Sequence, residues 1–159
     1  MSGVVRGYAE RGGSIAERLE ERRGGLAVLV DPARTDRECA LELARRAEGE
    51  GAAALLVGNS FGCDDVGAVA DALREGAPAT PLIQFPATAS QLVAVVDAVL
   101  FLSLVSGRNA QYLIEEHVRA VPFLDRHPQV EVISTAYCLV DGGRVTSVEA
   151  VSQTRPLPA

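Results

Sequence analysis

The feature that most constrains the fold is a repeated alternation of short apolar runs with amphipathic segments. The apolar runs predict five strands, at residues 26–30, 52–58, 80–86, 97–105 and 130–140. The segments between them predict helices at residues 35–51, 64–76 and 110–124, and a helical turn or two at 90–96. The strands are apolar on both faces, which is typical of a parallel sheet covered by helices. The pattern leaves two architectures open, a doubly wound sheet and part of a (β/α)₈ barrel.

A single domain is predicted over the 159 residues. It comprises an N-terminal helix within residues 1–25, βα units over 26–140, and a hairpin and tail over 141–159. The hairpin is predicted because Gly142 and Gly143 favour a tight turn, after which residues 144–152 pair back.

Capping residues mark the starts of two predicted helices. Ser14 precedes the N-terminal helix. Thr35, with Glu38 three residues later, is expected to cap the helix at 35–51 through a capping box.

Composition excludes several classes of function. The net charge of −6 argues against electrostatic binding of nucleic acid. All fifteen basic residues are arginine, so neither a lysine Schiff base nor a Walker-type phosphate lysine is available. The apolar stretch around Asp97 is too short and too interrupted to span a membrane. Arg6, Glu10 and Arg11 stand where a signal peptide would have its apolar core, so a cytoplasmic location is expected.

Cysteine and histidine predict structural roles. Cys39, Cys63 and Cys138 are odd in number and far apart, so buried free thiols are expected rather than a zinc site or disulfides. His117 and His127 have no third ligand or nucleophile at a suitable spacing, so both are also expected to be structural.

Polar groups follow every predicted strand. The strand ends are Asp31, Gly58-Asn59-Ser60, Phe85-Pro86, Ser103 with the cluster 106–109, and Thr135 with Tyr137. In both candidate architectures, function lies at the carboxyl ends of parallel strands. These groups are therefore expected to converge on one pocket.

Five sequence blocks carry a specific resemblance. "LVDPAR", "LLVGNSFG", "PLIQFP", "DAVLFLSLVSGRNAQYLI" and "STAYCLVDGGRV" occur in the order and spacing typical of the geranylgeranylglyceryl phosphate synthase family, whose bacterial branch includes heptaprenylglyceryl phosphate synthases. The chain resembles this family over residues 26 to about 148, and the fourth block is the most specific. The resemblance implies a TIM barrel and a role in phospholipid biosynthesis. The implied reaction is Mg²⁺-dependent transfer of a prenyl group from its diphosphate to a glycerol phosphate.

The resemblance also implies roles for particular residues. Asp31 matches the family's metal-binding aspartate, and Ser60 matches the hydroxyl residue that completes the metal site. Substrate-binding residues are expected to be Gly58, Ser103, Arg108, Asn109 and Tyr137. From the residues alone, Arg108 could instead be a surface arginine, Asn109 a helix cap, and Tyr137 a packing residue.

The chain departs from the family pattern at several points. "VGNS" stands for "VGGS", "FPA" for "FPG", and "VSGRNA" for "LNSRNP". The family's "YLEAGSG"-type segment and glycine-rich loops, which bind the glycerol phosphate and supply a glutamate base, have no match here. No catalytic residue is therefore predicted. Self-association or a complementing chain is expected, because an open arc of barrel exposes strand edges and its inner face.

Three hypotheses follow from the sequence. The first is a truncated or split prenyltransferase, inactive or weakly active alone. The second is a non-catalytic half-barrel that binds a prenyl or phosphorylated ligand. The third is an α/β interaction domain without a ligand.

Overall fold

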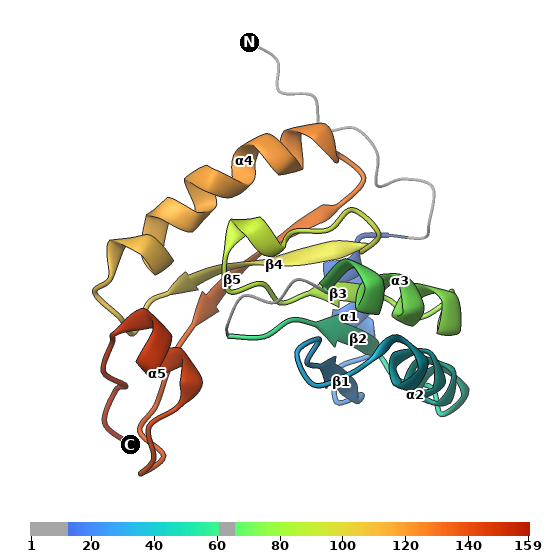
Figure 1. Cartoon of the computed structure of the whole chain (residues 1–159), viewed down its shortest axis with the longest axis horizontal. Coiled ribbons are helices and arrows are strands. Elements are labelled where there is room, and N and C mark those ends of the chain that lie inside the picture. Colours follow the sequence, from blue (N-terminus) through green and yellow to red (C-terminus); the bar gives the residue numbers. More distant parts are fainter. Residues whose placement is uncertain (1–12, 61–65) are drawn as a thin grey trace.

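A single parallel sheet organises the molecule. The computed structural model describes residues 13–60 and 66–159, so the predictions made on Arg6, Glu10, Arg11 and Cys63 lie outside the described residues. The strands are β1 (Ala27–Val30), β2 (Ala54–Val57), β3 (Leu82–Gln84), β4 (Ala98–Leu104) and β5 (Glu131–Tyr137). All neighbouring strands are parallel and follow one another in chain order (Figure 1).

The strand order decides between the two predicted architectures. A doubly wound sheet has its first strand in the interior, with later strands added on both sides. Here β1 lies at one edge and β5 at the other. The predicted partial (β/α)₈ barrel is therefore confirmed.

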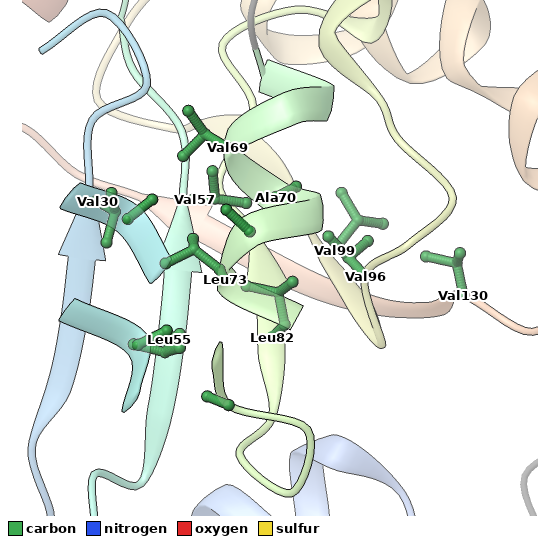
Figure 2. Packing of buried hydrophobic residues seen from close by; sticks show 14 residues of the cluster. Val30, Leu55, Val57, Val69, Ala70, Leu73, Leu82, Val96, Val99 and Val130 are labelled. Carbon is green, nitrogen blue, oxygen red and sulfur yellow. The ribbon is translucent and has the colours of Figure 1, made fainter. Parts of the chain in front are cut away.

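Two helices cover one face of the first three strands. α2 (Arg37–Gly49) and α3 (Val66–Gly76) lie side by side (Figure 1). Their small residues Ala40, Ala44 and Ala70 are fully buried and allow close packing on the sheet. Figure 2 shows the resulting core, in which Leu55 and Val57 of β2 pack in one cluster with Val69 and Leu73 of α3. Burial of such aliphatic side chains stabilises a fold by roughly 1.5–3 kcal/mol each.

α1 (Ile15–Glu21) packs on the opposite, inner face of the sheet. Its N-cap is Ser14, as predicted, and Glu17 completes a capping box. The carboxylate of Glu131, at the start of β5, accepts hydrogen bonds from the backbone N–H groups of Ile15 (2.5 Å) and Ala16 (3.1 Å). Because Glu131 is buried, these bonds anchor α1 to the amino end of the last strand.

The connection from β3 to β4 contains less helix than predicted. Instead of one or two helical turns over 90–96, it holds a single 3₁₀ turn, η1 (Ala89–Gln91), and Leu92 already has an extended backbone. No helix of the α2 or α3 kind covers this part of the sheet in the described residues. The outer face of β4 is instead flanked by η1 and by α4 (Glu116–Arg126). A π-helical turn, η2 (Gln111–Glu115), leads into α4.

The predicted hairpin at the end of the chain is wrong. Residues 144–152 do not return as a strand, because Ser147–Ser152 form a short helix, α5. Thr146 caps it and forms a capping box with Glu149, which stabilises the first helical turn over an extended backbone. In the described residues, the segment after α5 pairs with the segment after β5 through one parallel bridge, between Val140 and Leu157.

Two smaller predictions also need correction. The N-cap of α2 is Asp36 rather than Thr35, because the Asp36 carboxylate accepts from the N–H of Cys39 at 2.8 Å. Cys39 and Cys138 are free thiols as predicted, but both are exposed rather than buried, since neither side chain faces the apolar core.

No helix in the described residues is both long and apolar enough to cross a bilayer.

Candidate functional site

A cavity of about 350 Å³ opens at the carboxyl ends of the strands. Its lining comes from β1, β4 and the end of β5, from the segments that follow β2 and β3, and from η2, α4 and α5. α5 lies near the carboxyl ends of β4 and β5 (Figure 1). The lining is mostly apolar, with hydroxyl and amide groups at the strand ends, and the volume is that of a small-molecule site.

Three of the seven predicted site residues line this cavity: Gly58, Ser60 and Tyr137. Gly58 has a packing reason to be glycine, because a Cβ there would lie 1.8 Å from the carbonyl oxygen of Phe85. Tyr137 packs edge-on against the ring of Phe85, with centroids 5.7 Å apart. Burial raises the pKa of Tyr137 above its ordinary value.

The segments after β2 and β3 are joined by two amides. Gln91 Nε2 donates to Asn59 Oδ1 at 2.9 Å, and Gln91 Oε1 accepts from the N–H of Ala87 at 2.7 Å. Gln84, fully buried on β3, donates to the Gln91 carbonyl. The amide nitrogen of Asn59, Nδ2, is buried and has no hydrogen-bond acceptor among the described residues. The loops on this side of the cavity are thus held as one unit, with one amide donor left over.

The far wall of the cavity lies between β4 and α4. His117 stacks on Phe101 with centroids 4.0 Å apart, and its Nε2 lies 2.7 Å from the Leu102 carbonyl. Glu116 accepts from the N–H of Ala89 at 2.8 Å and so ties α4 to η1. Burial, and secondarily the Glu116 carboxylate, raise the pKa of Tyr112. His117 thus packs against β4 and also lines the cavity, and its structural role stays a prediction.

The other histidine lies away from the cavity lining. His127 packs against Phe123, with ring centroids 4.4 Å apart, which accords with its predicted structural role.

The polar cluster after β4 holds the end of the chain. Ser106 Oγ accepts from the N–H of Leu139 at 2.9 Å, and Asn109 Nδ2 donates to the Ser152 carbonyl at 2.8 Å. Gly107 lies so close to Thr154 that a Cβ would meet its methyl group at 2.6 Å. These contacts fix the segment that carries α5.

Four predicted site residues do not line the cavity: Asp31, Ser103, Arg108 and Asn109. Arg108 is exposed and donates to the neighbouring Gly107 carbonyl at 2.8 Å. Asn109 accepts from the N–H of Gln111 at 3.1 Å, so it also starts the following helical turn, as the alternative reading expected. Their substrate-binding roles stay predictions.

The implied magnesium ion can be compared with the donors present. Among the described residues, no group of three or more His, Cys, Asp or Glu side chains could hold a metal ion by itself. Asp31 accepts from the N–H of Ala33 at 3.0 Å through one carboxylate oxygen, Oδ1. Asp31 and Ser60 supply the types of oxygen donor that Mg²⁺ prefers, a carboxylate and a hydroxyl, and their metal-binding roles stay predictions.

Sequence reasoning missed the contributions of Ser147 and Gln91, and it missed the pairing of Gln91 with Asn59. The predicted hairpin puts Ser147 in a strand, although the spacing of Thr146 and Glu149 is a capping-box signal for a helix. The side chains of Asn59 and Gln91 are 32 residues apart in the sequence, and no local sequence pattern predicts their hydrogen bond.

Comparison with known proteins identifies what the chain resembles. The model of the PcrB family matches residues 17–158. The geranylgeranylglyceryl phosphate synthase of Flavobacterium johnsoniae is 38% identical over 144 residues, which are 87% of this chain and 58% of that protein. The protein of the same name from Spirosoma linguale is 37% identical over 136 residues, covering 86% and 54%.

Solved structures agree with the fold. The synthase of Thermoplasma acidophilum in complex with its substrate sn-glycerol-1-phosphate has a TM-score of 0.78 and 26% identity. The match covers 91% of this chain and 58% of that one. The chain thus spans a little over half the length of the relatives it matches. The family resemblance found in the sequence is confirmed, and the chain belongs to the PcrB family.

Proposed function

We propose that this chain provides the prenyl diphosphate-binding half of a prenyltransferase related to geranylgeranylglyceryl phosphate synthase. The observation that carries the proposal is the cavity, because it combines hydroxyl groups at the strand ends with an apolar space between β4 and α4. A prenyl diphosphate has the same two parts. Names of relatives support the reaction class, since several are called geranylgeranylglyceryl phosphate synthase.

The apolar part of the cavity suits a hydrocarbon tail. Leu92, Val99 and Phe101 line it from the β3–β4 connection and from β4, and Ala120 lines it from α4. This space exists because only a 3₁₀ turn, rather than a full helix, lies between β3 and β4. Transfer of an isoprenoid chain from water into such surroundings is favourable by roughly 25 cal/mol per Å² of apolar surface removed from water.

The polar part suits the diphosphate. Ser60 supplies a hydroxyl at the cavity, and Asp31 supplies a carboxylate at the end of β1. These two residues would hold Mg²⁺, which neutralises the charge of a departing diphosphate when bound. Asp31 and Ser60 therefore bind and orient the donor, while Leu92 and Phe101 exclude water from the tail.

The acceptor half is proposed to come from a further polypeptide segment. The relatives extend well beyond the part that this chain matches, and glycerol 1-phosphate is bound by one of them. In this chain the edges of β1 and β5 have no neighbouring strand in the described residues, and Leu29 is 53% exposed beside the cavity. Such edges and faces favour association. Self-association and the cytoplasmic location stay predictions.

A calorimetric titration tests the proposal. Geranylgeranyl diphosphate is titrated into the chain with Mg²⁺ and again with EDTA. The proposal predicts binding that weakens when Mg²⁺ is removed, and a loss of that difference in Asp31→Asn. Glu38→Gln, an exposed change on α2, serves as the matched control. Identical titrations with Mg²⁺ and EDTA would refute the metal assignment, and no binding at all would refute the donor half.

A further inference from the structure

Two hydroxyl groups from distant parts of the chain meet at the cavity. Ser147 Oγ, on the first turn of α5, donates a hydrogen bond to Ser60 Oγ at 3.1 Å, across 87 residues of sequence. Both residues line the cavity, together with Gly58 and Tyr137. The contact therefore joins the end of β2 to α5 at the polar end of the site.

The direction of this hydrogen bond matters for what Ser60 can do. A hydroxyl has one hydrogen and two lone pairs. Since one lone pair of Ser60 accepts from Ser147, its own hydrogen must point elsewhere, and no other hydrogen bond of Ser60 is formed in the described residues. That hydrogen is left as a donor at a cavity wall, where the phosphate oxygens of a ligand are acceptors only.

The segment that carries Ser147 is held in place by hydrogen bonds of its other residues. Asn109 donates to the Ser152 carbonyl. The hydroxyl of buried Ser152 donates to the Val148 carbonyl at 2.6 Å, so it accepts from Thr154 Oγ1 at 2.7 Å. The two ends of the segment are closed by backbone bonds of 2.8 Å between Leu157 and residues 139 and 141. α5 is thus fixed over the strand ends rather than attached only by its chain.

We propose that Ser147 is a positioning residue for Ser60, which it orients to donate a hydrogen bond to an anionic phosphate oxygen in the cavity. The proposal rests on the function proposed above and adds α5 to the diphosphate site. It also assigns a role to Ser106 and Asn109 after β4, because these residues bind the segment on which Ser147 lies.

The test uses inorganic pyrophosphate, which probes the polar end without the apolar tail. Calorimetric affinities are measured in Mg²⁺ buffer for the wild-type chain, S147A, S147T, S60A and the double variant S60A/S147A. Loss of one orienting hydrogen bond in S147A should weaken pyrophosphate binding by about three- to tenfold. S147T keeps a hydroxyl and should bind like the wild type. The double variant should be no weaker than S60A, because Ser147 acts through Ser60.

The outcomes separate this inference from the proposed function. Wild-type affinity in S147A would overturn it, as would equal losses in S147A and S147T, or losses that multiply in the double variant. In those cases pyrophosphate binding by the wild-type chain would leave the proposed function standing. No pyrophosphate binding by the wild-type chain would overturn both. Thermal midpoints of S147A and S147T, measured in parallel, should match the wild type, because Ser147 is exposed.

Discussion

Asn109 donates a hydrogen bond of 2.8 Å to the carbonyl of Ser152, which joins the end of β4 to the last residue of α5. The same side chain accepts from the N–H of Gln111. One amide thus starts the helical turn after β4 and holds the C-terminal segment. An asparagine suits this position because it offers both a donor and an acceptor.

Replacement of Asn109 should therefore loosen α5 selectively. Asn109→Asp keeps an acceptor for Gln111 but loses the donor, so a carboxylate faces the Ser152 carbonyl. The expected loss of folding free energy is about 1–3 kcal/mol, measured by urea unfolding. Hydrogen exchange should rise over residues 139–157. Arg155→Gln, an exposed change in the same segment, is the control, and equal exchange in both variants would contradict the assignment.

Glu131 should contribute to stability through α1. In Glu131→Gln, the amide group retains one oxygen and turns an NH₂ toward the N–H groups of Ile15 and Ala16. Because hydrogen bonds to a buried charged acceptor are strong, a loss of about 1.5–3 kcal/mol is expected in urea unfolding. Glu21→Gln, on the exposed part of α1, should change stability little. Similar midpoints for both variants would show that α1 docks without this carboxylate.

Gly58 and Gly49 make a matched pair of glycines. Gly58→Ala places a Cβ 1.8 Å from the Phe85 carbonyl oxygen, so one of the two loops must move. Overpacking of this kind destabilises by typically 1–3 kcal/mol. Gly49→Ala, in α2 with nothing within 4 Å of the new Cβ, should instead stabilise by roughly 0.5–1 kcal/mol. Chemical denaturation of both variants measures the contrast, and a tolerated alanine at position 58 would refute the close approach.

Alkaline pH should destabilise the fold through its partly buried phenols. Burial raises the pKa of Tyr137 in the folded chain above its unfolded value of 10.0, so the neutral phenol is favoured by folding. That contribution is fully present below pH 10.0 and is lost as the pH rises through the folded pKa. Phenolate absorbance should show a late-titrating component, to which Tyr112 also contributes, and this component should become smaller in Tyr137→Phe. If the variant and the wild type titrate with the same late component, Tyr137 is not its source.

The sequence predicts the regular part of this fold well, for a physical reason. β1, β2 and β4 are apolar on both faces, which is typical of strands in a covered parallel sheet. The barrel topology needed the family resemblance, because strand order depends on contacts that local periodicity does not encode. The hairpin prediction failed because Gly142-Gly143 favours a turn in either case, while the helix signal lay in Thr146 and Glu149.

The site was only partly predictable. Ser60 lies shortly after the end of β2 and Tyr137 is the last residue of β5, so their place at the cavity follows from topology. Asn109 follows a strand too, yet its amide is satisfied by Ser152, a partner 43 residues away. Pairings at that range are set by the folded backbone, so residue type and spacing cannot distinguish a ligand-binding amide from one that holds a loop.

The central claim is that this chain binds the prenyl donor and needs a second segment to use it. Radiolabelled prenyl transfer from geranylgeranyl diphosphate to glycerol 1-phosphate tests it most directly. The assay is run with the chain alone, and with a polypeptide that comprises the part of the Flavobacterium johnsoniae relative outside the match. Since an unplaced acceptor forfeits the benefit of positioning, transfer by the chain alone should be at least about 100-fold slower than with the added polypeptide. Full turnover by the chain alone would contradict the account, as would absence of transfer in both reactions.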